Sequence, residues 1–234
     1  MQWSSGRPFV PPAVLDRLHL RRAAMRYAAR GWTVMPGAYL RDGRFTCGRA
    51  GCRIAGCHPA LESWQDEAVA DARRVSAWWR HRPYQVLLAT GRTFDVLEVP
   101  ASVGLRALGA TRLHTDVLGP DRADGRGPVA VGPTGRWMFF VRPGVPLRSE
   151  LDNCLDVVRH GRGSWVPAAP SRMPEGAVRW ATSPAKVHWR LPGSAPVQAM
   201  LVDALAALGR WPAKRPAEQP AAVPRQMSTS RRAV

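Results

Sequence analysis

A loop between residues 41 and 60 carries the residues whose types and spacing point most directly to chemistry. It contains Cys47, Cys52, Cys57 and His58, in the pattern C-x4-C-x4-C-H. Thiolate sulfur and imidazole nitrogen are ligands that zinc prefers, and structural zinc sites take four of them. Cys57 and His58 are adjacent, so both can bind one ion only where the backbone turns sharply, and the usual C-x2-C pairs are absent. We expect a structural Zn²⁺ site; free thiols, or a disulfide formed on oxidation, are the alternative.

A second segment with chemical potential is the run from His160 to Ser164, His-Gly-Arg-Gly-Ser. Its glycines are compatible with a phosphate-binding loop. It lacks the Lys-Ser/Thr of a P-loop and the spacing of a dinucleotide-binding loop. Serine and histidine residues occur along the chain, but nothing in their spacing indicates a catalytic triad.

Helices and strands that alternate along the chain must position these residues. Apolar residues at helical spacing predict helices over 12–30, 67–81, 101–109 and 196–208. Short apolar runs between glycines and prolines predict strands over 32–35, 85–90, 94–99, 129–131, 137–141, 155–159 and 164–166. Interleaved helices and strands are typical of the α/β or α+β class.

Composition and charge exclude several classes of protein. The chain has 234 residues, 45% of them apolar, and a net charge of +17, which fits a globular protein with a basic surface rather than a disordered one. A basic surface favours polyanionic partners, although nearly all the basic residues are arginine, as expected of a GC-rich gene. No run approaches the roughly 20 apolar residues of a membrane span, and the N-terminus has no secretory signal. We therefore expect a cytoplasmic protein without a disulfide scaffold or a membrane partner.

The chain divides into a body and a tail. Residues 210–234 contain four prolines and no apolar periodicity, which predicts a disordered, Pro/Arg-rich tail. Residues 1–209 show no internal repeat and no long linker, and we expect them to form one domain.

The order of landmarks in this body resembles the N-terminal domain of bifunctional DNA primase/polymerases, the prim-pol branch of the archaeo-eukaryotic primase superfamily. The resemblance is strongest over residues 15–190. The landmarks are Tyr27–Trp32 at a helix end, His58-Pro59 after a cysteine loop, Trp78-Trp79, Thr90-Gly91-Arg92, Gly135–Phe140, Arg162–Val166 and Pro170-Ser171. The resemblance implies a prim-pol-like core with mixed sheets flanked by helices.

The resemblance also implies Mg²⁺- or Mn²⁺-dependent nucleotidyl transfer by two aspartates in a D-x-D strand motif, a histidine on a later strand and a third aspartate. The positions that match the D-x-D motif are Glu98 and Pro100. Pro100 cannot bind a metal ion, and Asp95 lies an odd number of residues from Glu98, on the opposite strand face. The family histidine falls on Trp137 and the third aspartate near Arg162. We therefore expect the fold to persist and the polymerase chemistry to be impaired or lost.

Basic and aromatic residues remain near the expected nucleotide pocket. We expect nucleotide or single-stranded DNA binding by Arg92, Arg136, Trp137, Arg159, His160 and Arg162. Two other hypotheses stay open: an active primase/polymerase that uses Glu98 in an altered metal site, and a non-catalytic protein-interaction module. The chain has no P-loop, so any helicase would come from a separate protein, as would other replication partners.

Overall fold

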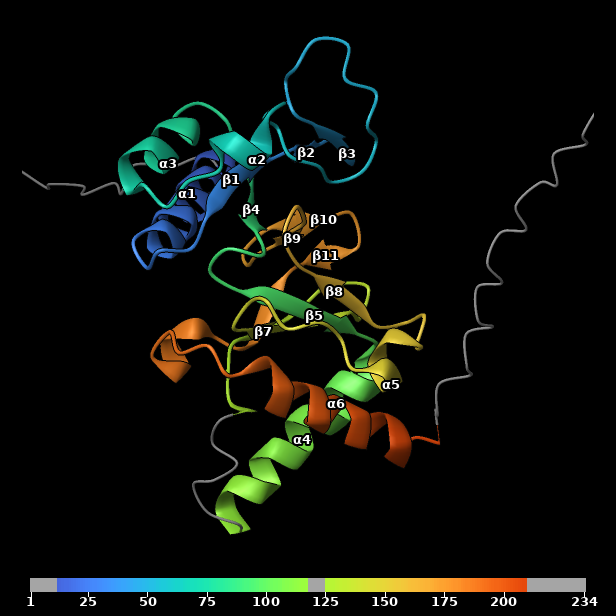
Figure 1. Ribbon diagram of the computed structural model, residues 1–234. Helices are drawn as coiled ribbons and strands as arrows, with labels where there is room; N and C mark the ends of the chain where they lie inside the picture. The colour runs from blue at the N-terminus through green and yellow to red at the C-terminus, as the bar shows by residue number, and fades with distance from the viewer. Residues whose placement is uncertain (1–11, 118–124, 210–234) are drawn as a thin grey trace, which may run out of the picture.

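The computed structural model describes residues 12–117 and 125–209 (Figure 1). The elements follow one another as α1 (Pro12–Ala28), β1 (Val34–Gly37), β2 (Tyr39–Arg41), β3 (Arg44–Thr46), α2 (Trp64–Glu67), α3 (Ala72–Trp78), β4 (Gln85–Ala89), β5 (Asp95–Val99), α4 (Ala101–Val117), β6 (Val129–Val131), β7 (Trp137–Val141), α5 (Ser149–Asp152), β8 (Val158–His160), β9 (Trp165–Pro167), β10 (Arg172–Met173), β11 (Gly176–Ala177), β12 (Arg179–Thr182), the 3₁₀ turn η2 (Pro184–Val187) and α6 (Ser194–Ala207). The predicted tail, 210–234, lies outside the described residues.

Two sheets form the centre of the fold. One has three strands in the order β1-β4-β9, and the other has five in the order β12-β6-β7-β5-β8. The pairs β2-β3 and β10-β11 form small hairpin sheets. The mixed sheets that the resemblance implied are corrected here: every strand pair of the described residues is antiparallel. The class is therefore α+β, one of the two predicted from the sequence.

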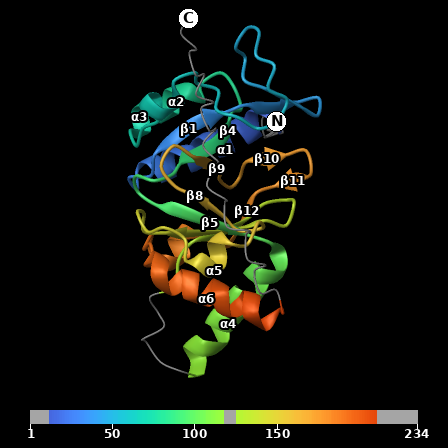
Figure 2. The same ribbon diagram turned by 45° about the vertical axis from the view of Figure 1, so that its right-hand side comes forward.

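Helices and sheets form layers, which Figure 2 shows from the side. One core lies between α1 and the two sheets and contains Trp32, Val86, Val96 and Phe140. A second core lies between the five-stranded sheet and the helices α4 and α6. Successive strand residues face opposite sides, so β5 contributes Val96 to the first core and Leu97 and Val99 to the second.

Several predicted elements have other bounds in the structure. The helix expected over 101–109 continues to Val117, and the strand expected over 155–159 is Val158–His160. The strand expected to stop before Pro36 continues to Gly37, because β1 is an edge strand, where a missing backbone N–H is tolerated.

The helix expected over 67–81 is shorter, spanning Ala72–Trp78 as α3. Val69 exchanges backbone hydrogen bonds with Val34 instead of joining the helix. The helix then begins after the N-cap Asp71, whose side chain accepts from Arg74 N at 2.6 Å.

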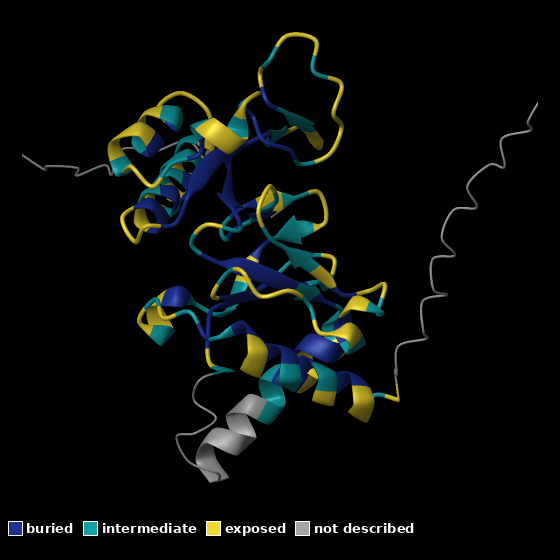
Figure 3. Cartoon of the chain, in the orientation of Figure 1, coloured by how far each residue is buried: buried dark blue, intermediate teal, exposed yellow. Residues whose placement is uncertain are grey.

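Burial in Figure 3 follows the same layers: the strands β1, β4, β5 and β7 are almost entirely buried, whereas the small hairpins and the loop tips are partly or fully exposed. Among the described residues, no helix has both the length and the apolar character of a membrane span.

Candidate functional site

A polar cluster lies where β5, β7 and β8 run side by side. Glu98 on β5 is opposite Met138 of β7 on one side and Val158 of β8 on the other. Its carboxylate is on the strand face that also carries Val96, and the side chain is 21% exposed. Glu98 therefore places a charged group on the sheet face that carries the apolar residues Val96 and Met138.

The side chains of Arg136 and His160 hold the carboxylate of Glu98. Arg136 Nε donates to Oε1 at 2.7 Å, and His160 Nε2 lies 2.8 Å from Oε2. Arg136 also donates to the backbone carbonyl of Asp156 at 2.8 Å, which fixes its guanidinium. Burial alone would raise the pKa of Glu98, but the hydrogen bonds from His160 and Arg136 outweigh burial and hold the pKa below its usual value. Glu98 is therefore a carboxylate with both oxygens occupied.

Ser164 extends this cluster; the sequence placed it in the His160–Ser164 run but not among the predicted binding residues. His160 Nδ1 lies 3.0 Å from Ser164 Oγ. A carboxylate only accepts hydrogen bonds, so the neutral imidazole carries its hydrogen on Nε2 toward Glu98 and leaves Nδ1 to accept from the Ser164 hydroxyl. The only sequence signal was the spacing of four residues across a glycine-containing turn, which many turns share.

Two predicted members of the cluster lie on the other side of the sheet, which corrects that part of the prediction. Arg159 forms an ion pair with the buried Asp95, with Nη2 2.8 Å from Oδ2. Trp137 is buried in the core that α4 and α6 cover, where Gly104 of α4 faces its indole. Both residues are one position away from the polar face, and strand alternation directs them to the opposite face. Their side chains serve packing and charge neutralisation within the protein.

The same alternation identifies the β7 residue that faces Glu98. It is Met138, which pairs directly with Glu98 and belongs to the core between the sheets. A histidine that shared the face of the carboxylates would occupy this position rather than that of Trp137. The β7 side of the cluster is therefore apolar.

Arg92 and Arg162 lie on two loops that pack against each other. Thr90 joins the loops: its N–H donates to Ser164 O at 3.0 Å and its hydroxyl to Gly161 O at 2.6 Å. Gly91 adopts a φ of +86°, and a Cβ there would lie 2.2 Å from Arg162 Cα. Both arginines are exposed, and neither forms an ion pair within residues 12–117 and 125–209. This pair of loops therefore presents two cations to solvent beside the His160–Ser164 pair.

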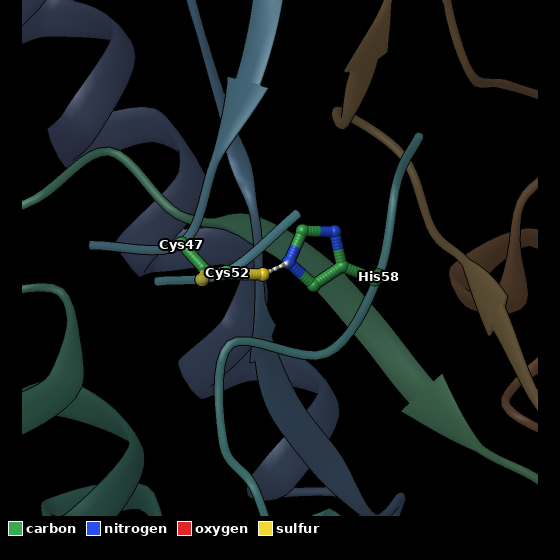
Figure 4. A group of neighbouring side chains, drawn as sticks. All are labelled: Cys47, Cys52 and His58. Carbon is green, nitrogen blue, oxygen red and sulfur yellow. Dashed lines mark hydrogen bonds between the residues drawn. The ribbon is translucent and has the colours of Figure 1, made fainter. Parts of the chain in front are cut away.

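The cysteine loop forms a separate candidate metal site (Figure 4). One ligand atom from each of Cys47, Cys52 and His58 lies within 4.8 Å of the others. His58 Nδ1 is 2.7 Å from the carbonyl oxygen of Gly56, so Nδ1 carries the hydrogen and Nε2 presents its lone pair toward Cys52 Sγ, 3.4 Å away. Burial would raise the pKa of Cys47, but hydrogen bonds from Arg49 and His58 lower it to about 6, which favours the metal-binding thiolate.

The fourth predicted ligand, Cys57, lies outside this group, which corrects the predicted ligand set. Its side chain packs against the apolar cluster of Met35, Ala68 and Leu87. Burial raises the pKa of the Cys57 thiol to about 12, so the thiol stays protonated. Because His58 points toward Cys47 and Cys52, its neighbour Cys57 points away from them.

Comparison with known protein families gives one match. The family of bifunctional DNA primase/polymerase N-terminal domains (Prim-Pol) matches residues 24–211, most of the chain. No curated protein matches the sequence.

Proposed function

Because the chain belongs to the bifunctional DNA primase/polymerase N-terminal family, we propose that it binds single-stranded DNA or nucleotides at a site that no longer transfers nucleotides. The phosphates would be held by Arg92 and Arg162, with His160 and Ser164 beside them. The family acts on DNA and nucleotides. What we propose for this chain is which of its residues bind them and that it no longer transfers nucleotides.

The engagement of Glu98 is the single observation that carries the proposal. Two-metal catalysis needs carboxylates whose oxygens are available to Mg²⁺ or Mn²⁺. Both oxygens of Glu98 are occupied by Arg136 and His160, and Pro100 offers no ligand. A divalent cation would also meet the positive charge of Arg136 within a few ångströms of Glu98. These residues do not fit the metal pair, and we derive no catalytic step through it.

The surrounding residues are suited to phosphate instead. Arginine presents a planar fork of donors and a permanent charge, which match phosphate oxygens. Gly91 permits the close approach of the two loops that carry Arg92 and Arg162. Ser164 Oγ adds a hydroxyl that can turn from His160 toward a ligand.

Two assays test the proposal together. Primer synthesis and extension on single-stranded DNA, with Mg²⁺ or Mn²⁺ and all nucleotides, should give no product. The same protein should bind a labelled single-stranded oligonucleotide with an affinity that falls steeply as the salt concentration rises. The double variant R92Q/R162Q should weaken this binding roughly tenfold, whereas the matched variant R106Q/R172Q, which removes two exposed arginines elsewhere, should not.

Each alternative has its own result in these assays. Synthesis by the natural protein that is lost in Glu98→Ala would establish an active primase/polymerase with an altered site. Absence of both synthesis and oligonucleotide binding would support a protein-interaction module.

We further propose that Cys47, Cys52 and His58 hold a Zn²⁺ ion through three protein ligands, which leaves the fourth position to water or another ligand. The observation in favour is the convergence of two sulfurs and one oriented imidazole nitrogen. Bound zinc would tie the ends of the 47–58 loop together and stabilise the lobe that contains β1 and β4. Cys47→Ser and Cys52→Ser should abolish zinc binding in elemental analysis, whereas Cys57→Ser should retain one zinc per chain. Equal zinc content in all three variants would contradict this ligand set.

A further inference from the structure

Helix α1 and the turn that follows it present three exposed arginines to solvent. Arg22 and Arg26 are one helical turn apart, so they lie on one face of the helix, and Arg30 lies in the turn just after the helix end at Ala28. We call these three arginines the α1 stripe. Leu20, Ala24 and Tyr27 of the same helix are buried. The stripe is thus the basic, solvent-exposed part of an otherwise core-bound helix and its C-terminal turn.

The charges of the α1 stripe are not neutralised within the structure. In the ranges 12–117 and 125–209, no ion pair involves any of its three arginines. Asp16 is the only acidic residue of α1. By contrast, Arg136 and Arg159 are paired with Glu98 and Asp95. The stripe therefore carries three cations that are available to an external anion.

Arg30 at the end of the stripe is held in place by an aromatic ring. Its guanidinium carbon lies 5.4 Å from the ring centroid of Trp189, in range of a cation–π interaction. Trp189 has a φ of +62°, which bulky residues rarely adopt. Its indole meets Tyr27 and Trp32 edge-on, with centroids 6.2 Å and 5.4 Å apart. Packing thus offsets an unfavourable backbone conformation that places a ring beneath Arg30.

We propose that the α1 stripe binds the phosphate backbone of single-stranded nucleic acid, at a surface separate from Arg92 and Arg162. Four residues of helix advance about 6 Å, so Arg22 and Arg26 are about 6 Å apart along the axis of α1. A strand in a duplex carries one phosphate per about 3.4 Å of axis, so these two arginines span about two phosphates, and Arg30 extends the stripe beyond the helix end. An arginine plane held over an indole also offers a surface on which an unpaired base can stack.

The burial of α1 favours nucleic acid over a membrane as the partner. Peripheral membrane helices insert an apolar face into the lipid. The apolar face of α1 is already used in the protein core, where Ala24 and Tyr27 are buried. What remains for a partner is charge with little apolar area, which suits a phosphate backbone.

The experiment measures binding of a fluorescein-labelled 25-nucleotide oligothymidine by anisotropy over a range of salt concentrations. The full chain is compared with the stripe variant R22Q/R26Q, its charge-conserving counterpart R22K/R26K, the loop variant R92Q/R162Q and the control R106Q/R172Q. Arg106 of the control lies on α4, at the end of the molecule opposite α1 (Figure 1). Circular dichroism confirms that each variant is folded.

The stripe variant should bind roughly tenfold more weakly, and its salt slope should fall by about 0.7 for each arginine removed. R22K/R26K and the control should keep the slope of the natural chain. An unchanged slope in R22Q/R26Q would overturn the proposal, and so would an equal loss in the control, which would indicate a general effect of net charge.

The loop variant R92Q/R162Q separates this proposal from the function proposed above. Weaker binding in the stripe variant alone would support the α1 surface and reject binding at Arg92 and Arg162. Weaker binding in the loop variant alone would support Arg92 and Arg162 and reject the α1 surface. Vesicles containing phosphatidylserine form a last arm: if the stripe variant loses vesicle binding and keeps oligonucleotide binding, the partner is a membrane and the proposal is wrong.

Discussion

At the scale of single residues, Glu98 shows how neighbours decide what a carboxylate does. An exposed glutamate on a strand would be free to bind a cation. Here Arg136, which precedes β7, and His160 of β8 approach from either side of β5 and occupy both oxygens. The charge of Glu98 is consequently neutralised by partners within the protein. These interactions should contribute to the free energy of unfolding.

Glu98→Gln should destabilise the protein by about 1–3 kcal/mol at pH 7, because it removes the charged acceptor of two hydrogen bonds. The pKa of Glu98 in the folded protein is below its usual value, so the contribution is complete above the unfolded pKa, about 4.3. It is lost as the pH falls through the folded pKa. Denaturant unfolding from pH 7 to pH 3 should show the difference from the natural chain shrinking toward acid.

Glu175→Gln is the control for this pH series, because Glu175 is exposed. Its small effect on stability should not vary over the same range. A difference for Glu98→Gln that stayed constant down to pH 3 would contradict the ion-paired state of Glu98.

At the scale of elements, two glycines allow close contacts that a helix or a turn would otherwise exclude. Gly104 places α4 against the indole of Trp137, where an added Cβ would lie 2.4 Å from Trp137 Cγ. Gly91 does the same for the two arginine loops. At both positions, a close contact with a neighbouring segment explains why the residue is glycine.

Gly104→Ala should therefore destabilise the protein, although alanine is the better helix former by about 1 kcal/mol. Gly109→Ala in the same helix meets no atom within 4 Å and should stabilise it by up to about 1 kcal/mol. Opposite signs in thermal unfolding are the expected result. Stabilisation by both substitutions would show that α4 does not approach Trp137 this closely.

Gly91→Ala tests the loop contact beside the site. Its cost combines the left-handed φ with a clash against backbone atoms of Arg162. Gly31→Ala has a similar φ of +77° with no atom within 4 Å, so it measures the conformational cost alone, about 1 kcal/mol. Gly91→Ala should cost clearly more in urea unfolding and should weaken oligonucleotide binding. If both substitutions lowered the free energy of unfolding equally, Arg162 would not lie against Gly91.

At the scale of the whole molecule, the core between α1 and the sheets joins the two halves of the fold. Trp32 stacks on Phe140 of the five-stranded sheet, with centroids 5.3 Å apart, and on Tyr27 of α1. Val86 and Leu88 of the three-stranded sheet belong to the same core. The sheets therefore share their largest buried side chains.

A shared core predicts that the two halves unfold together. Denaturation followed by far-ultraviolet circular dichroism and by tryptophan fluorescence should give coincident transitions. Trp32→Phe should shift both curves to lower denaturant by the same amount, because it opens a cavity in contact with both sheets. Two separated transitions would indicate that the sheets are independent folding units.

Much of this protein was determined by local sequence. The apolar spacing predicted the helices α1 and α6, the short apolar runs predicted β4 to β7, and the order of landmarks indicated the family that the comparison shows. The cysteine loop was identifiable because its three cysteines and one histidine lie within 12 residues of one another. These features depend on residues close together in the chain.

Only the tertiary structure decided which of these residues share a site. Val34 pairs with Val69, which shortens a predicted helix. Glu98 and His160 meet across β5 and β8, while Asp95 and Arg159, three positions and one position away from them, meet on the other face. Cys57 is partly buried in an apolar cluster, apart from Cys52. The physical reason is that a side chain's face on a strand follows from register, and the register of β5 is set by partners 38 to 64 residues away.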